Sequence, residues 1–230
     1  PLYTLEAMFP TLQDELVFIG DNGGAIRWKG QNLFTSEMSP EGWRALNRLT
    51  REQGDIAVLC GLESAYVERP FAVHDAVLRH FYTKIEYVDR LEDVAAPADK
   101  FTIYLPQHNA QQAYDTVYAS QRSIYSVAVA GECWVDIMNP GVHKGAALQT
   151  LGQLWGLPSE SMMAFGDTYN DAEMLRTAKY GFLMENGSVP LCQKVPFLAP
   201  SHREAGVMQV LHRVLAQNGC VCPEDFIPAH

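Results

Sequence analysis

The chain has 230 residues, 47% of them hydrophobic and 19% charged, a composition that allows a buried core and excludes a disordered or fibrous protein. Its formal net charge of -10 and the lack of a Lys/Arg run argue against a nucleic-acid partner. No uninterrupted apolar stretch has the roughly 18 residues of a membrane span and no signal-peptide pattern opens the sequence, so we expect a cytoplasmic protein without a membrane partner.

The first part of the chain predicts the beginning of an α/β fold. Apolar spacing predicts a helix from Leu5 to Leu12, and a short apolar strand follows over residues 16–20. This strand leads into residues 21–24, Asp-Asn-Gly-Gly. The glycine turn at residues 28–30 then predicts a hairpin.

In the middle of the chain, strand and helix signals alternate without a regular order. Ser39 and Pro40 supply an N-cap and a first-turn proline for a helix that ends at Gly54. The other predicted elements are helices over residues 71–81 and 109–121, and strands over residues 55–60, 101–105, 123–130 and 132–138. We expect this block to form a compact α+β unit.

Beyond Pro140 the pattern changes to a regular alternation of strands and helices. The predicted elements are helices over residues 144–155, 171–178 and 203–215, and strands over residues 162–165 and 180–184. Such alternation is typical of a parallel sheet covered by helices.

The domain borders are expected in turns, because no linker or low-complexity tract interrupts the chain. We predict that residues 1–33 and 139–230 form one α/β core. Residues 34–138 would then be an inserted αβ domain.

The sharpest local signal follows the strand predicted at residues 162–165, where a loop contains Asp167, Asn170 and Asp171. Loops at the carboxyl ends of parallel strands lie at the edge where α/β sheets bind ligands. Because carboxylate oxygens suit a hard cation, Asp167 and Asp171 are candidate Mg²⁺ (magnesium) ligands, and Asn170 would face the same crevice. The alternative is structural: Asp171 caps the next helix and Asp167 forms a turn.

The second signal is Lys144, which opens a predicted amphipathic helix. Its ammonium at the helix entrance can neutralise a phosphoryl oxygen, and the first-turn amides add their dipole. The alternative is a solvated lysine beside a turn.

Taken in order, a lysine that opens a helix and a GD-x-x-x-D loop that closes the next strand resemble the Cof-like phosphatases of the haloacid dehalogenase (HAD) superfamily. Further segments with this resemblance are Asn-Gly at residues 22–23, Glu-Met-Leu at 173–175, Met-Glu-Asn-Gly at 184–187, Ser-His at 201–202 and Gly-Val at 206–207. The resemblance spans nearly the whole chain, and the combination is far more specific than any one motif.

The resemblance implies a Rossmann-like HAD core, here incomplete at its N-terminal side, with an inserted α+β cap of the C2 type that closes over a small phosphorylated metabolite. Carried across, Lys144 is the catalytic, phosphate-binding lysine, Asp167 is the Mg²⁺ ligand, and Asp171 is a supporting or occasional ligand.

The resemblance also assigns three asparagines to substrate binding. Asn170 would bind the phosphate, while Asn22 and Asn186 stand at positions that line the family's pocket. For Asn22 and Asn186 the alternative is a turn residue with left-handed backbone angles.

The sequence departs from the family at the nucleophile, an aspartate that the family carries in an N-terminal DxDGT motif. No DxDGT occurs in the 230 residues, and the nearest imitation, residues 21–24, has glycine where the second acid belongs. We therefore expect the chain to begin just after both N-terminal motifs. Since covalent phosphoryl transfer needs a nucleophile placed in line, the chain alone is expected to be inactive or nearly so.

The leading prediction is therefore a Mg²⁺-dependent phosphatase that hydrolyses a sugar phosphate, nucleotide or cofactor phosphate through a phosphoaspartate. The alternative is a pseudophosphatase or fragment that serves as a metabolite- or protein-binding module. A sugar-phosphate mutase of the same superfamily is a third interpretation. Nothing in residues 34–138 selects one substrate, and the sequence does not indicate an oligomeric state.

Overall fold

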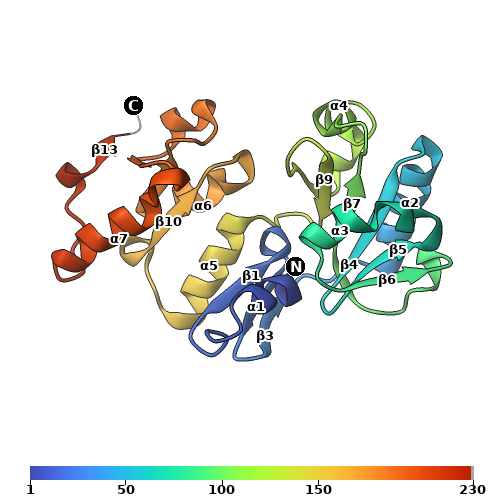
Figure 1. Cartoon of the computed structure of the whole chain (residues 1–230), viewed down its shortest axis with the longest axis horizontal. Coiled ribbons are helices and arrows are strands. Elements are labelled where there is room, and N and C mark those ends of the chain that lie inside the picture. Colours follow the sequence, from blue (N-terminus) through green and yellow to red (C-terminus); the bar gives the residue numbers. More distant parts are fainter. Residues whose placement is uncertain (229–230) are drawn as a thin grey trace. The chain divides into compact units, whose positions relative to one another are not determined.

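The computed structural model describes residues 1–228, with only the backbone described for residues 192–194. The chain divides into two compact units, Pro1–Val142 and His143–His230, drawn from blue to yellow-green and from yellow to red in Figure 1. No helix within residues 1–228 is both long enough and apolar enough to span a membrane. The expectation that residues 1–33 share a core with residues 139–230 stays a prediction.

The first unit contains two sheets. Its helices are α1 (Leu2–Met8), α2 (Pro40–Gln53), α3 (Asp75–Phe81) and α4 (Ala110–Asp115). Its strands are β1 (Val17–Gly20), β2 (Ala25–Trp28), β3 (Gln31–Thr35), β4 (Ile56–Gly61), β5 (Ala65–Glu68), β6 (Ile85–Val88), β7 (Ala98–Tyr104), β8 (Ser126–Val129) and β9 (Trp134–Met138). Strands β1, β2 and β3 form an antiparallel sheet, which confirms the predicted hairpin. The other sheet has six strands in the order β6-β5-β4-β7-β9-β8, all antiparallel except the β5–β6 pair.

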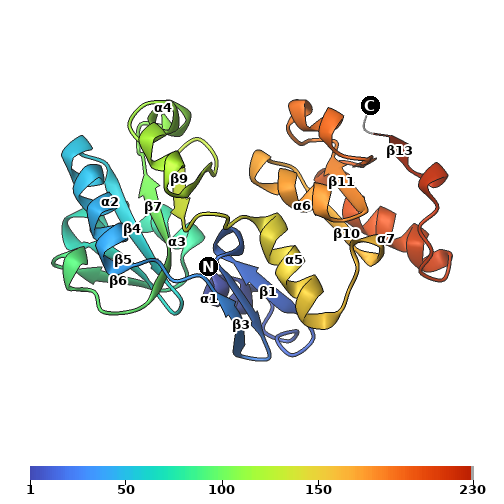
Figure 2. The ribbon, with the colours of Figure 1, turned by 180° about the vertical axis from the view of Figure 1, so that it is seen from behind.

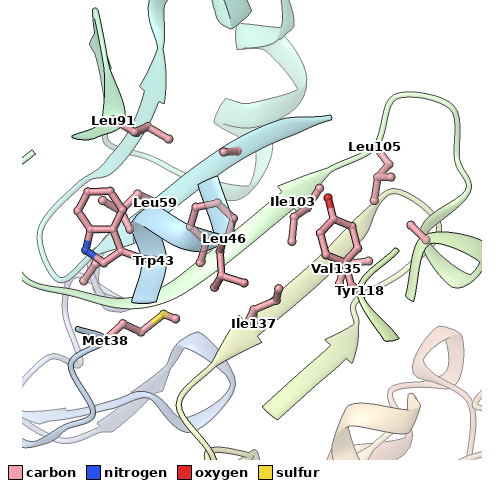
Figure 3. Packing of buried hydrophobic residues seen from close by; sticks show 14 of the residues in the cluster. Met38, Trp43, Leu46, Leu59, Leu91, Ile103, Leu105, Tyr118, Val135 and Ile137 are labelled. Atoms are coloured by element: carbon pink, nitrogen blue, oxygen red, sulfur yellow. The ribbon is translucent and has the colours of Figure 1, made fainter. Parts of the chain in front are cut away.

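Helix α2 begins and ends where its sequence signals predict. The Ser39 hydroxyl accepts a hydrogen bond from the amide of Gly42 at 3.0 Å, Pro40 opens the first turn, and Gly54 closes the helix with a left-handed φ of 74°. Together with α4, this helix covers one face of the six-stranded sheet (Figure 3). The labelled side chains in that core are Met38, Trp43, Leu46, Leu59, Leu91, Ile103, Leu105, Tyr118, Val135 and Ile137.

The opposite face of the same sheet packs against α3 and against the Tyr3 side chain of α1. Its apolar members include Val58, Val67 and Trp134. The strand residue Lys100 is also buried, and its presence among apolar neighbours requires partners for its charge.

The two ends of the middle block are tied to each other. The amide Nδ2 of Asn139, directly after β9, donates to the hydroxyl of Ser36 at 3.1 Å and to the carbonyl of Glu37 at 2.8 Å. One residue further on, the amide of Met38 donates to the carbonyl of Ala98 at 2.8 Å. The chain therefore enters and leaves this block at one place.

The second unit is a layered α/β structure (Figures 1 and 2). Its elements are α5 (Lys144–Trp155), β10 (Met163–Gly166), α6 (Ala172–Thr177), β11 (Tyr180–Met184), β12 (Phe197–Ala199), α7 (Gly206–Ala216) and β13 (Ile227–Pro228). The sheet order is β10-β11-β12-β13, with parallel pairs except for the last. Alternate strand residues point to opposite faces. One face packs with α5 and α6 and the other with α7, which confirms the predicted parallel sheet covered by helices.

Four predicted helices differ from the observed ones by three or more residues at one or both ends. The helix expected from residue 203 begins at Gly206, because a 3₁₀ segment and a left-handed residue precede it. The helix expected to reach Leu12 ends at Met8, because Pro10 disfavours helical backbone at the residue before it. The helix expected over residues 71–81 is a 3₁₀ segment followed by α3, and the one expected over residues 109–121 breaks after Asp115. Strands β5 and β6 were not predicted, because their short mixed sequences carry little period-two signal.

Candidate active site

The loop after β10 is held in shape by the side chain of Asp171. Its Oδ2 accepts hydrogen bonds from the amides of Asp167 and Thr168, both at 3.0 Å, and from the Thr168 hydroxyl at 3.2 Å. The Thr168 side chain accepts in turn from the amide of Asp171, so the two residues form a capping box ahead of α6. Gly166 permits this closeness, because a Cβ there would lie 2.5 Å from the Cβ of Asp171.

Lys144 is bound to the same carboxylate. Its Nζ lies 2.5 Å from Oδ1 of Asp171, whose residue is only 4% exposed. Burial by itself would raise the pKa of Asp171. The ammonium of Lys144, aided by the Thr168 and Asp167 amides, outweighs burial and lowers that pKa below its ordinary value. Asp171 is therefore an anion that holds both the loop and the lysine.

The position of Lys144 is set by the start of α5. His143 has an extended backbone and caps the helix, and Lys144 is the first helical residue. Next to it, Gly145 packs directly on the backbone of Glu173 in α6, where a Cβ would lie 2.7 Å from the Glu173 carbonyl. The first turns of α5 and α6 therefore touch at Gly145, which brings Lys144 to Asp171.

Asp167 differs from Asp171 in its surroundings. Its side chain is exposed, and no described side chain or backbone group forms a hydrogen bond or ion pair with its carboxylate, the side chains of residues 192–194 being outside this description. Its backbone is held by the loop that follows β11, because the Asp167 carbonyl accepts a hydrogen bond from the amide of Ser188 at 2.8 Å. Gly187 allows this approach, since a Cβ there would lie 2.8 Å from the same carbonyl. The loops after β10 and β11 thus meet at Asp167.

The predicted asparagines have identified side-chain contacts. Asn170 accepts from the Thr168 hydroxyl at 2.5 Å, so it belongs to the loop of Asp167 and Asp171. Asn186, in the loop after β11, accepts from the amide of His202 at 2.9 Å. Of the predicted site residues, the second unit brings together Lys144, Asp167, Asn170 and Asp171, and links the loop of Asn186 to them through the backbone.

The oxygen chemistry of this loop fits part of a Mg²⁺ site. The free carboxylate of Asp167 is the kind of ligand that Mg²⁺ prefers. Both oxygens of Asp171 are already engaged, which suits a supporting position better than a direct ligand. Among the side chains that the structure describes, which exclude those of residues 192–194 and 229–230, no group of three or more His, Cys, Asp or Glu is arranged to hold a metal ion. Asp167 therefore offers one ligand of a shell that needs more.

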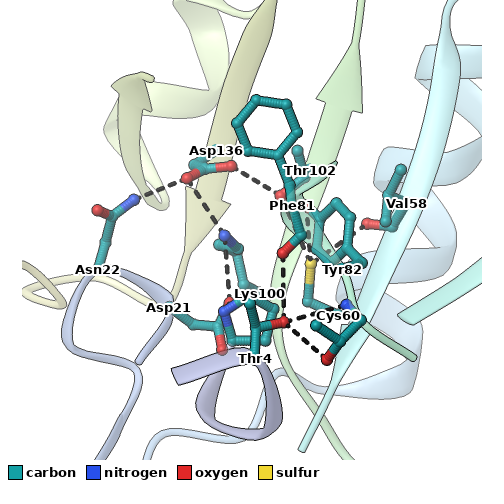
Figure 4. A network of polar contacts seen from close by, with 12 residues as sticks. Thr4, Asp21, Asn22, Val58, Cys60, Phe81, Tyr82, Lys100, Thr102 and Asp136 are labelled. Atoms are coloured by element: carbon teal, nitrogen blue, oxygen red, sulfur yellow. Dashed lines mark hydrogen bonds and ion pairs between the residues drawn. The ribbon is translucent and has the colours of Figure 1, made fainter. Parts of the chain in front are cut away.

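Asn22 lies in the first unit and takes part in a different polar network (Figure 4). Its Nδ2 donates to Oδ2 of Asp136 at 2.7 Å, and Asp136 also accepts from the Thr102 hydroxyl at 2.7 Å. Lys100 lies between two carboxylates, 3.1 Å from Asp21 and 3.4 Å from Asp136.

Burial by itself would lower the pKa of Lys100, but the charges of Asp136 and Asp21 outweigh it and raise that pKa well above its ordinary value. The sequence interpretation missed this cluster. Part of its signal was present, because Asp136 interrupts the otherwise apolar strand at residues 134–138.

A family model described as haloacid dehalogenase-like hydrolase matches residues 1–211. The chain is 31% identical over 216 residues to the 5-amino-6-(5-phospho-D-ribitylamino)uracil phosphatase YbjI of Escherichia coli K12, covering 93% of this chain and 79% of that protein. It is 44% identical over 64 residues to an HMP-PP phosphatase of Cronobacter sakazakii, covering 28% of this chain and 24% of that protein.

Among solved structures, SMU.1108c from Streptococcus mutans UA159 superposes with a TM-score of 0.85 at 28% identity. The match covers 94% of this chain and 83% of that one. The family model covers most of the chain, and the matches to YbjI and to SMU.1108c extend over nearly the same span. The chain therefore belongs to the haloacid dehalogenase-like hydrolases.

Proposed function

We propose that the parent activity is Mg²⁺-dependent hydrolysis of a small phosphorylated metabolite. The observation that carries this proposal is the Lys144–Asp171 ion pair beside the free carboxylate of Asp167, at the carboxyl ends of parallel strands. This is the edge at which open α/β sheets bind ligands. The printed names of two relatives, both phosphatases of small phosphorylated compounds, support the same class of substrate.

In this proposal each side chain has a separate task. The ammonium of Lys144, oriented by Asp171, binds a phosphoryl oxygen and offsets its charge. Asp167 would hold Mg²⁺, which when bound stabilises charge on phosphoryl oxygens. Asn170 would donate its amide to the phosphate, and Asn186 would line the pocket.

The covalent step needs a nucleophile, and these 230 residues do not contain the motif expected to carry it. The resemblance implies attack by an aspartate of a DxDGT motif, and the sequence contains none. We propose that this nucleophile lies outside the 230 residues and that they are inactive or nearly so by themselves. A phosphate held by Lys144 without a nucleophile in line gains binding but little reaction rate.

We also propose that residues 34–138 act as a cap and that residues 1–33 and 139–230 form the core. The hydrogen bonds from Asn139 to Ser36 and Glu37, and a six-stranded sheet drawn entirely from residues 56–138, support an insertion. The Asn22–Asp136 bond ties residues 1–33 to the proposed cap, and a role for Asn22 in substrate binding stays a proposal. A cytoplasmic location stays a prediction.

The absence of DxDGT favours a second candidate, a module that binds a metabolite or protein without catalysis. Two proteins separate the candidates: the 230-residue chain, and the same chain joined to an N-terminal segment that carries DxDGT. Hydrolysis of p-nitrophenyl phosphate would be measured with and without Mg²⁺, and in Lys144→Ala, Asp167→Ala and the control Lys179→Ala, an exposed lysine of the same unit.

The proposal predicts activity in the extended chain that requires Mg²⁺, Lys144 and Asp167 but not Lys179. An extended chain that is inactive would favour the binding module. Full activity in the 230-residue chain would contradict an external nucleophile.

A further inference from the structure

His143 caps helix α5 with a ring nitrogen. Its Nδ1 accepts a hydrogen bond from the amide of Ala146 at 3.1 Å, and its backbone is extended with φ -163° and ψ 163°. Side-chain oxygens of Ser, Thr, Asp and Asn are the usual acceptors at this position. Here an imidazole fills the role, immediately before Lys144.

An imidazole can accept at Nδ1 in only one charge state. The neutral ring with its proton on Nε2 has a lone pair on Nδ1, whereas the imidazolium carries N–H groups on both nitrogens and accepts nothing. Protonation of His143 therefore removes the cap. It also places a positive charge at the helix N-terminus, where the helix dipole is itself positive.

The cap acts on the turn that positions Lys144. The first turn of α5 is held by the His143 bond to Ala146, by the contact of Gly145 with the Glu173 backbone, and by the bond of Lys144 to Asp171. The four first amides of a helix have no intrahelical partner, so loss of a cap frays this turn first. Fraying moves the backbone that carries Lys144.

Protons from solvent can reach the imidazole. His143 is half-buried and lines an open cleft of about 620 Å³. The other lining residues are Gln149, Ser159, Glu173, Arg176 and Thr177. The charged groups that face the cleft, Glu173 and Arg176 of α6, pair with each other at 2.8 Å. Lys144, the adjacent charge on α5 itself, is paired with Asp171.

We propose that His143 is a positioning residue for Lys144 and that it keeps this role only as the neutral imidazole. The first turn of α5, and with it the backbone of Lys144, should then lose order when acid protonates the imidazole. The consequence for phosphate binding rests on the function proposed above. The effect on the helix turn does not.

The experiment compares the 230-residue chain with His143→Asn, His143→Ala and the control His212→Asn, an exposed histidine of α7. Hydrogen exchange of the Ala146 amide is followed by NMR from pH 5 to 8 and corrected for intrinsic exchange. Asparagine is among the best caps and its carbonyl accepts at every pH in this range.

As the pH is lowered, protection of the Ala146 amide from exchange should decrease in the parent and in His212→Asn. It should stay constant in His143→Asn. In His143→Ala it should be low throughout, by about five-fold, the size of a lost N-cap. A pH dependence in His143→Asn equal to that of the parent would overturn the proposal.

Affinity for inorganic phosphate, measured by calorimetry on the same proteins, tests the link to Lys144. The ratio of parent to His143→Asn affinity at each pH cancels the titration of phosphate itself. This ratio should fall by several-fold between pH 8 and 5, and His143→Asn should bind more tightly than His143→Ala at pH 8.

An Ala146 amide that responds while phosphate affinity is the same in all variants would overturn the positioning role. If no variant binds phosphate, the function proposed for this site fails. The exchange profile then still decides whether His143 caps α5 in the neutral form.

Discussion

The Nζ atom of Lys144 lies 2.5 Å from Oδ1 of Asp171, and this pair joins the first turn of α5 to the loop that follows β10. The other carboxylate oxygen holds the amides of Asp167 and Thr168. One buried side chain therefore organises the loop and orients the lysine together.

Replacing Asp171 with Asn should lower the free energy of unfolding by about 2 kcal/mol, because the buried carboxylate loses the charge that pairs with Lys144 and that strengthens its hydrogen bonds from two amides. Urea denaturation at pH 7 measures the change. Glu185→Gln, an exposed carboxylate of the same unit, should change it by less than about 0.5 kcal/mol. Equal effects of the two substitutions would contradict a structural role for Asp171.

The contribution of Asp171 to the free energy of unfolding should depend on pH. Lys144 and two amides lower its pKa in the folded state below the ordinary 3.8, despite burial. A group with a lowered folded pKa stabilises the protein above its unfolded pKa, and this contribution is lost as the pH falls through the lowered value. The stability difference between the parent and Asp171→Asn, measured with urea, should therefore shrink below about pH 4. A difference that stays constant down to pH 2 would speak against this.

Asp167→Asn should leave the fold as stable as before, within about 0.5 kcal/mol, since no described group bonds to its exposed carboxylate. Its effect should appear in metal binding. Calorimetry should find weak Mg²⁺ binding in the 230-residue chain, because Asp167 supplies only part of an oxygen shell, and weaker binding in the variant. Tight binding that survives the substitution would exclude Asp167 as a ligand.

Lys100→Met should destabilise the first unit by about 3 to 5 kcal/mol, because Asp136 would remain buried without a counter-charge and Asp21 would lose its ion pair at 3.1 Å. Thermal or urea unfolding tests this. The matched control is Lys84→Met, which removes an exposed lysine of the same unit. If both variants unfold at the same denaturant concentration, the buried cluster adds no net stability.

Gly145→Ala should weaken phosphate binding although the residue itself has no functional group. The added methyl would lie 2.7 Å from the Glu173 carbonyl and would push the first turn of α5 away from α6, taking Lys144 with it. Gln149→Ala, on the exposed side of the same helix, is the control. Unchanged phosphate affinity in Gly145→Ala would mean that the helices can shift without moving the lysine.

The sequence predicted those elements whose ends carry strong local signals. Helix α5 and strand β11 have the predicted bounds, and α2 begins at its serine cap and ends before Gly54. Nearby residues determine where such an element ends, so these ends can be recognised in the sequence without knowledge of the fold. Where two signals competed, as at Pro10, the predicted helix ran too far.

The contacts that no local pattern reveals are the long-range ones. That Lys144 lies beside the loop of Asp171 could be predicted only through a family resemblance, since the two residues lie on different elements. The partners of Lys100 come from β9 and from the turn after β1, and which strands become neighbours depends on the whole sheet. The imidazole cap at His143 was also missed, because histidine is not among the usual capping residues.

The bonds from Asn139 to Ser36 and Glu37 also bear on how such a chain can change over evolutionary time. A segment whose two ends lie side by side can be exchanged for another of different length without moving the chain on either side of it. Selection could then change the segment between Glu37 and Asn139 while the loop of Asp171 stays constant. Variation would then be confined to one module, and the contacts that hold Lys144 to Asp171 would be inherited unchanged.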